Sequence, residues 1–143
     1  MKLDRRIKPD SLENFFSLPN QIYSLGLEAG EIAVYGYLRS LKNRETYQCW
    51  PSYATIGKAI GRTKNTVMQY VDALSEKGLI STEPTSVLTK SRIKKNGNLR
   101  YTIRPIHEAV EIFHTRQLSA VERTTERRQI HRKLSAVNLL PGA

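Results

Sequence analysis

Apolar residues recur at helical spacing in three separate stretches of the chain. Residues three or four positions apart lie on the same face of an α-helix, so each stretch predicts a helix with one apolar face. The predicted helices cover residues 28–41, 52–60 and 63–77. Their apolar faces consist of Ile32, Tyr35 and Leu38; of Ile56, Ala59 and Ile60; and of Val67, Val71 and Leu74.

Hydroxyl and glycine residues mark the ends of the second and third predicted helices. Ser52 and Thr63 come just before the apolar repeats, where a hydroxyl can accept a hydrogen bond from a free backbone N–H group. Gly61 and Gly78 follow the repeats, and glycine tolerates the left-handed conformation that is common just past a helix end. The sequence therefore predicts two consecutive helices joined by a tight turn.

After the third predicted helix the pattern changes from helical spacing to alternation. Residues 79–88 and 99–104 are predicted to be extended. In the second segment alternate positions are apolar, as in a strand buried on one face: Leu99, Tyr101 and Ile103. Between the segments, Asn96-Gly97 is a dipeptide typical of hairpin turns. We expect a further short extended piece to pair with this hairpin as a third strand.

The polar face of predicted helix 63–77 is divided along its length. Basic and amide side chains occupy its N-terminal half, whereas Asp72 and Glu76 occupy its C-terminal half. Because phosphates repel carboxylates, such a helix would enter a DNA groove with its N-terminus first. Asparagine and glutamine can form paired hydrogen bonds with adenine. The candidate contacts of this recognition helix are Arg62, Thr63, Lys64, Asn65, Thr66, Gln69 and Tyr70.

The segment between the predicted strands is basic. From Lys90 to Arg104 the sequence contains six Lys or Arg residues and no acid. Such a run is usually a solvated loop, but a loop beside a DNA-reading helix favours contact with the backbone or the minor groove. We therefore interpret residues 88–100 as a basic wing. The candidate wing and backbone contacts are Ser52, Tyr53, Lys90, Arg92, Lys94, Lys95, Asn98 and Arg100.

Four segments together resemble the winged helix-turn-helix superfamily: GLEAGEIAVYGYL, CWPSYATIGKAIG, NTVMQYVDALSEKGLI and LRYTIRPI. The resemblance is greatest to domains of bacterial mobile elements, phages and plasmids, including the N-terminal domains of replication initiators and replisome organisers. It covers roughly residues 15–106 and implies a mainly α fold with a small β-hairpin. In this fold a three-helix core carries the wing, and here a C-terminal helical extension would follow. The resemblance also implies binding to double-stranded DNA, often as a dimer, and no enzymatic activity in this domain.

Charge and composition agree with a nucleic-acid partner. The chain has 143 residues, a formal net charge of +10 and a pI of about 9.9. We expect an N-terminal arm over residues 1–24, the DNA-binding domain over 25–106, and a C-terminal helix and basic tail over 107–143. Because Cys49 is the one cysteine, an internal disulfide is excluded. No apolar run suggests a membrane span, so we expect a cytoplasmic, nucleoid-associated bacterial protein.

The last residues are predicted to contain a helix over 107–120, followed by a tail of which the final ten residues are poorly ordered. This helix could join two copies into a homodimer or fold back on its own domain, and the apolar N-terminal arm is a second candidate for a dimer contact. The three histidines, His107, His114 and His131, form no metal-binding pair, and no phosphate-binding loop or nucleophile motif is present. We therefore expect neither an active site nor a cofactor or metal.

Three functions fit these patterns. The first is a sequence-specific transcriptional regulator. The second is a replication-initiation or replisome-organising protein that uses the same domain to bind an origin. The third is a winged-helix module that binds protein, which would require apolar residues on the outer face of helix 63–77. The polar outer face disfavours the third function, and the short C-terminal extension favours the first over the second.

Overall fold

Three helices form the centre of the fold in the computed structural model, which describes residues 15–88, 90 and 94–138. They are α1 (Ala29–Leu41), α2 (Tyr53–Ile60) and α3 (Lys64–Glu76), and a short 3₁₀ helix, η2 (Asn20–Ser24), precedes them. All three predicted helices are thus confirmed. Their bounds differ from the predicted ones by one residue at most ends, because each predicted cap lies just outside the helix that it caps.

The helix ends follow the predicted local signals. The hydroxyls of Ser52 and Thr63 accept hydrogen bonds from the backbone N–H groups of Thr55 and Thr66. Gly61 adopts a left-handed conformation with φ 73°, which ends α2 and turns the chain into α3. At α1, Glu28 and Glu31 form a reciprocal capping box.

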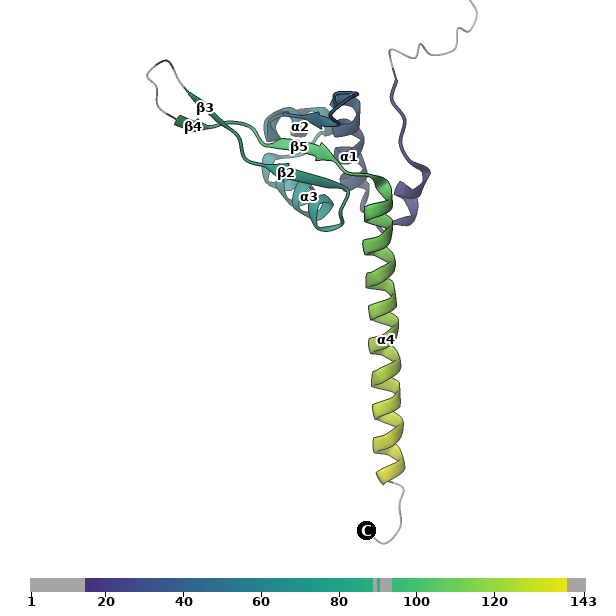
Figure 1. The fold of residues 1–143 in the computed structure, drawn as a ribbon. Coiled ribbons are helices and arrows are strands. Elements are labelled where there is room, and N and C mark those ends of the chain that lie inside the picture. The colour runs from purple at the N-terminus through teal and green to yellow at the C-terminus, as the bar shows by residue number, and fades with distance from the viewer. Residues whose placement is uncertain (1–14, 89, 91–93, 139–143) are drawn as a thin grey trace, which may run out of the picture.

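A three-stranded antiparallel sheet packs beside these helices (Figure 1). Its strands are β1 (Gln48–Cys49), β5 (Arg100–Ile103) and β2 (Ile80–Glu83), in the spatial order β1-β5-β2. Cys49 lies opposite Tyr101, and Ile80 lies opposite Ile103. The predicted alternation in residues 99–104 is confirmed, because Tyr101 and Ile103 are buried whereas their neighbours in β5 are only half-buried. The expected third strand is β1.

The wing is a second, two-stranded ribbon that extends away from the domain (Figure 1). It consists of β3 (Ser86–Leu88) and β4 (Lys94–Asn96). The prediction that Asn96-Gly97 forms the hairpin turn is wrong, because Asn96 pairs with Ser86 at the base of the ribbon. A tight turn of the predicted kind needs positive φ angles, and Gly97 has none. Its N–H instead donates to the carbonyl oxygen of Thr85 at 2.8 Å, which continues the ribbon pairing.

One hydrophobic core joins the helices to the sheet. The predicted stripe of α3 is buried completely or almost so, with Val67 and Leu74 at 0% exposure and Val71 at 1%. Burial of side chains of this size stabilises a fold by about 1.5–3 kcal/mol each. The predicted role of Ala59 is wrong, because Ala59 is exposed whereas Ile56 is buried in the core.

Cys49 belongs to this core and is not a reactive thiol. Its Sγ lies 3.7 Å from the carbonyl oxygen of Leu38. Burial raises the pKa of the Cys49 thiol to about 11, so the nucleophilic thiolate is scarce at neutral pH. Its neighbour Trp50 is half exposed rather than packed in the core.

The C-terminal helix α4 (Ile106–Asn138) is far longer than predicted (Figure 1). Only its first turns contact the domain, where Ala109 is buried and Phe113 packs against the core. The predicted end near residue 120 is wrong, because α4 continues to Asn138 as a helix surrounded by solvent. It contains neither glycine nor proline, the residues that most often end a helix.

Candidate nucleic-acid interface

The N-terminal half of α3 presents a row of exposed polar side chains. Exposed residues here are Arg62, Thr63, Lys64, Asn65 and Gln69. Thr66 is half-buried, and its hydroxyl lies 3.0 Å from that of Thr63, within the cap. The predicted recognition residues, apart from Tyr70, are therefore brought together on one accessible surface.

Asp72 and Glu76 are exposed on the C-terminal half of α3, as the division by charge predicts. Asp72 also acts on Tyr53, the first residue of α2. Burial and then the negative charge of Asp72 raise the pKa of the Tyr53 hydroxyl. Tyr53 therefore keeps its proton at neutral pH and can donate a hydrogen bond to a phosphate oxygen.

Tyr70 has a structural contact that the sequence does not reveal. Its ring lies directly against Gly30 of α1, where any larger side chain would collide with the ring. The pair Gly30 and Tyr70 thus allows α1 and α3 to approach closely. Tyr70 is half-buried and belongs to the shell around the core.

The wing supplies positive charge, but less than the linear sequence indicates. Arg100 forms an ion pair with Glu83, its partner in the neighbouring strand. Lys90 is exposed, Lys94 and Lys95 lie on β4, and Arg92 lies outside the described residues. The acid-free run in the sequence is therefore partly neutralised in space by an acid from β2.

The base of the wing is attached to the start of α2. The Asn98 side-chain amide donates to the carbonyl oxygen of Trp50 at 3.1 Å. A small cavity of about 250 Å³ lies beside this bond, lined by Ser52, Tyr53 and Tyr101 among others. Ser52 is occupied as the cap of α2, where its Oγ accepts from the backbone N–H of Thr55 at 3.1 Å. The predicted residues Ser52, Tyr53 and Asn98 thus come together at one place.

Two exposed side chains near this surface were not predicted. Trp50 is 48% exposed at the foot of the wing, and Met68 is 42% exposed on α3. Helical spacing places Met68 on the flank of α3, outside the apolar stripe, so its exposure could have been found in the sequence. The exposure of Trp50 could not, because it depends on how the loop before α2 meets the wing.

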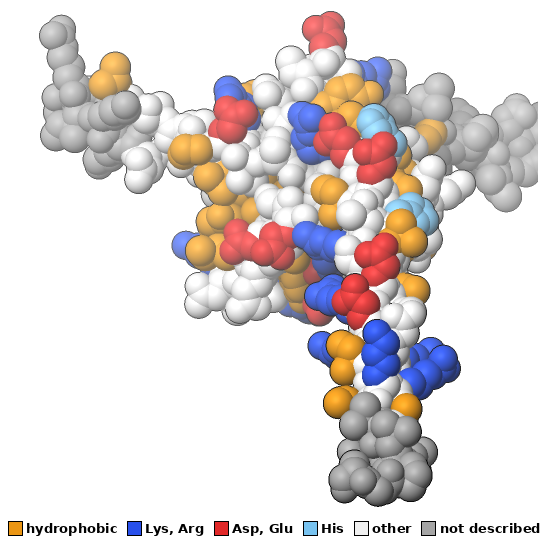
Figure 2. All heavy atoms as spheres, turned by 60° about the horizontal axis from the view of Figure 1, so that its bottom comes forward, with side chains coloured by type: hydrophobic (Ala, Val, Ile, Leu, Met, Phe, Trp, Pro, Cys, Tyr) orange, Lys and Arg blue, Asp and Glu red, His pale blue; other side chains and the backbone are white. Residues whose placement is uncertain are grey.

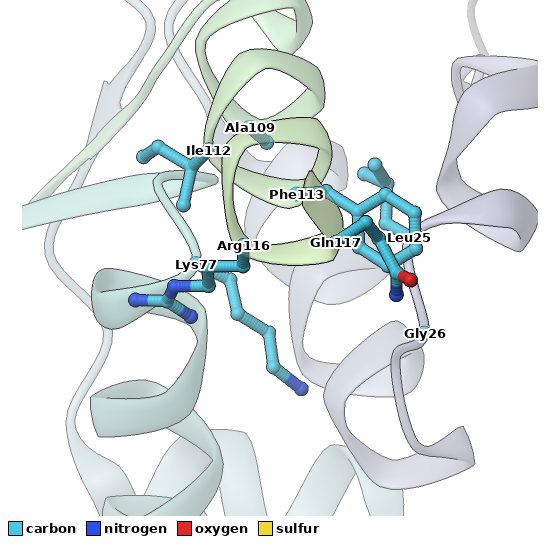
Figure 3. Close-up of a pocket in the computed structure, with 8 residues that line it drawn as sticks. All are labelled: Leu25, Gly26, Lys77, Ala109, Ile112, Phe113, Arg116 and Gln117. Carbon is cyan, nitrogen blue, oxygen red and sulfur yellow. The ribbon is translucent and has the colours of Figure 1, made fainter. Parts of the chain in front are cut away.

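A cavity of about 310 Å³ lies where α4 meets the domain (Figure 3). It is lined by side chains of α4, by the loop at Leu25 and Gly26, and by Lys77 at the end of α3. Lys77 forms an ion pair of 2.6 Å with Glu31 of α1. Arg116 of α4 donates to the carbonyl oxygen of Glu76 at 3.1 Å. The C-terminal end of α3 is therefore attached to both α1 and α4.

In the part of the chain that the structure describes, no group of three or more His, Cys, Asp or Glu residues is arranged to hold a metal ion. Among the same residues, no helix combines the length and the apolar character needed to cross a membrane.

Comparisons with known proteins agree with this geometry. Residues 25–80 match the family described as "Helix-turn-helix domain". No curated protein sequence matches the chain.

Several solved structures are similar to this chain at low sequence identity. A possible transcriptional regulator from Methanosarcina mazei Go1 is 16% identical, with a TM-score of 0.51 over 75% of this chain and 81% of that one. A Staphylococcus aureus MepR mutant bound to an oligodeoxyribonucleotide is 20% identical, with a TM-score of 0.44 over 82% of this chain and 81% of that one. A MarR-family regulator from Silicibacter pomeroyi is 15% identical, with a TM-score of 0.41 over 85% of this chain and 79% of that one. With three helices, a small sheet, a β-ribbon and a matching family over α1 to β2, the chain carries a winged helix-turn-helix domain.

Proposed function

We propose that this protein binds double-stranded DNA in a sequence-specific manner and acts as a transcriptional regulator. In this proposal the N-terminal half of α3 enters the major groove, and the wing contacts the backbone or the minor groove. The observation that supports it best is the distribution of charge on α3. Asn65 and Gln69 are exposed beside Arg62 and Lys64, whereas the acids lie farther along the helix.

The electrostatics of α3 give this docking a direction. The N-terminal end of a helix carries a partial positive charge, so it is attracted to phosphates. If α3 instead lay flat in the groove, Asp72 and Glu76 would approach the backbone and be repelled. Amide side chains can then read adenine through paired hydrogen bonds, each worth about 1–3 kcal/mol of discrimination.

The surroundings of α3 supply positioning contacts. Tyr53 lies at the start of α2 and can donate to a phosphate, and Lys90, Lys94 and Lys95 place positive charge on the wing. Arg100 is a weaker candidate, because Glu83 already neutralises it. Tyr70 contributes through its hydroxyl at most, since its ring is packed against Gly30.

Selection of bound fragments from the source genome tests this proposal. A regulator should enrich short sites beside promoters, and an Asn65→Ala/Gln69→Ala variant should lose that enrichment while it keeps its fold. Gln117→Ala/Gln129→Ala is the matched control, because both residues are exposed amides on α4. Enrichment of random fragments by the unaltered protein would contradict sequence-specific binding.

A replication role remains the second candidate, and the same selection distinguishes it. Clustered repeats beside an origin would indicate an initiator or a replisome organiser. A role as a protein-binding module is less well supported, because Met68 is the one large apolar side chain of α3 that is strongly exposed. One such residue does not form the apolar surface that a protein partner would need.

We further propose that α4 joins two copies of the chain. Every residue from Ala120 to Leu134 is exposed, so this half of α4 packs against none of the residues that the structure describes. Most of the stability of a helix in a protein comes from packing, so the outer half of α4 would gain stability from a second helix. Ile130 and Leu134 lie four residues apart on one face, at 57% and 59% exposure, and offer a contact to a second helix.

Sedimentation equilibrium tests the α4 contact. Ile130→Asp/Leu134→Asp should shift the protein from dimer to monomer without lowering the melting temperature of the domain. Leu118→Asp, on another face of the same helix, is the control. If the double variant is still a dimer, the dimer contact lies elsewhere, with the N-terminal arm as the next candidate. If the unaltered protein is a monomer, the proposed α4 contact is wrong.

A further inference from the structure

A second basic surface lies at the C-terminal end of α1. Two adjoining cavities, of about 510 and 300 Å³, share Arg39 as a lining residue. They lie between the N-terminal arm, the loop that follows α1 and the start of α4. We call this region the Arg39 surface and define it by Phe15, Phe16, Arg39, Lys42, Arg44 and Tyr47. In Figure 1 the purple arm lies on one side of the domain and the wing on the other.

Positive charge predominates at the Arg39 surface over the described part of the chain. Among the residues that the structure describes, no acid lines either cavity. Arg39 donates to neutral partners, from Nε to the Ser17 carbonyl oxygen at 3.0 Å and from Nη1 to the Tyr35 hydroxyl at 3.3 Å. Glu45 is exposed in the same loop as Arg44, and the nearby Arg104 is paired with Glu108. The net excess of cations fits an anionic ligand.

Aromatic rings are exposed among these cations. Phe15, Phe16 and Tyr47 are 49%, 47% and 44% exposed, so each ring retains a large accessible area. The Lys42 Nζ lies 4.1 Å from the centroid of the Tyr47 ring, which places a cation directly at an aromatic face. Cations beside exposed rings are the features that bind the backbone and the bases of unpaired nucleic acid.

The backbone of Tyr47 is held in an unfavourable conformation. Its φ angle is 58°, and it is the one residue other than glycine with a positive φ among those described. A bulky side chain rarely adopts this region. Its N–H donates to the Asn43 carbonyl oxygen, and its own carbonyl oxygen accepts from the Ile103 N–H, both at 2.9 Å. The loop therefore presents an aromatic ring where asparagine or glycine would be less strained, which is an observation typical of functional positions.

We propose that the Arg39 surface binds single-stranded nucleic acid. Arg39, Lys42 and Arg44 contact the phosphates, and Phe15 and Tyr47 stack with unpaired bases. A duplex fits this surface less well, because its base faces are already stacked on each other. An acidic peptide would use the cations but would leave the three rings without a matching partner. The proposal does not depend on duplex binding by α3, because the two surfaces share no residue.

Fluorescence anisotropy with labelled oligo(dT) of about 20 nucleotides, longer than a typical site, tests the proposal. The comparison ligand is the duplex of the same length. Lys42→Ala/Arg44→Ala/Tyr47→Asn should weaken oligo(dT) binding at least about tenfold, because two phosphate contacts and one stacking contact are lost. Duplex affinity should change less than about twofold. Asparagine is chosen because it tolerates a positive φ.

Control variants distinguish binding at the Arg39 surface from a nonspecific effect of net charge. Arg132→Ala/Lys133→Ala removes the same number of charges from α4 and should leave oligo(dT) binding unchanged. Phe15→Ala removes one exposed ring, threatens the fold little, and should weaken oligo(dT) binding with an unchanged salt dependence. Asn65→Ala/Gln69→Ala should have the opposite selectivity to the triple variant. It should weaken binding to the cognate duplex and leave oligo(dT) binding unchanged.

Three results would overturn the proposal. The first is an unaltered protein that does not bind oligo(dT). The second is an equal loss on oligo(dT) and duplex, which would make the Arg39 surface part of the duplex footprint. The third is displacement of oligo(dT) by poly-glutamate of equal charge, which would indicate an acidic protein partner. The first and third results leave duplex recognition by α3 unaffected, whereas the second would add the Arg39 surface to it.

Discussion

The helices α3 and α4 are held in place in opposite ways. α3 has 13 residues, a side-chain cap at its start and an apolar stripe that is almost fully buried. α4 has 33 residues and is buried only in its first turns. The contrast shows that α3 owes its position to its own domain, whereas the outer half of α4 packs against nothing in the described part of the chain. Figure 2 shows Lys, Arg and hydrophobic side chains together on that outer half.

The largest expected difference between α3 and α4 is in the stability lost when a carboxylate replaces an apolar side chain. Val71→Asp should destabilise the domain by more than about 3 kcal/mol, because an unpaired carboxylate would enter the core. Val121→Asp makes the same change at 60% exposure on α4 and should leave the melting temperature nearly unchanged. Thermal unfolding followed by circular dichroism measures both. A cooperatively folded Val71→Asp protein would contradict the assigned core face of α3.

The next difference concerns reading of bases. Asn65→Ala or Gln69→Ala should each cost about 1–3 kcal/mol at the cognate site and relax base preference there. The corresponding substitutions at Gln117 and Gln129 of α4 should cost nothing. Competition binding with cognate and random duplexes measures the effect. An equal loss on both duplexes would make Asn65 and Gln69 nonspecific contacts.

A smaller difference is expected between the wing and α4 in their contacts with phosphates. Lys94→Ala/Lys95→Ala should weaken binding to all duplex sequences and reduce the slope of log affinity against log salt by up to about two units. Arg132→Ala/Lys133→Ala removes two charges from α4 and should leave the slope unchanged. Titrations at several salt concentrations measure it. If the α4 pair lowers the slope and the wing pair does not, the DNA lies along α4 instead.

The smallest effect concerns the cap of α3. Thr63→Ala should destabilise the domain by about 1 kcal/mol, because the backbone N–H of Thr66 loses its acceptor. Thr125 of α4 donates its hydroxyl to the Val121 carbonyl oxygen, and Thr125→Ala should have little effect on the same measurement. Chemical denaturation resolves a difference of this size. Equal stabilities for both variants would mean that the cap contributes nothing measurable.

Sequence reasoning succeeded where the controlling interactions are local. The caps of α2 and α3, the left-handed Gly61 and the apolar stripe of α3 all depend on residues within a few positions of each other. The alternation of apolar and polar residues in β5 also predicts which of its side chains are buried. These signals were sufficient for the order of the helices and for the three-stranded sheet.

The errors arose where distant residues or competing signals decide the outcome. Asn96-Gly97 is a good turn sequence, but pairing of Ser86 with Asn96 moves the turn farther along the ribbon. The helix α4 ends beyond the predicted position, because mixed charge without periodicity favours a tail although no residue between 120 and 138 breaks the helix. On the proposed interface, the pairing of Arg100 with Glu83 was invisible because the acid comes from β2. The packing of Tyr70 on Gly30 was likewise hidden in the sequence, since it joins two helices.

The hydrogen bond from Arg116 to the end of α3 has a mechanical consequence. It attaches the long, exposed α4 to the C-terminal end of α3, opposite the end that is proposed to enter the DNA groove. At about 1.5 Å per residue, the outer twenty or so residues of α4 extend roughly 30 Å from this joint. A tilt of about 5° at the joint would therefore displace the far end by nearly 3 Å, by the same rise. If two copies are joined through α4, the angle between α4 and the domain at Arg116 sets the distance between their two α3 helices.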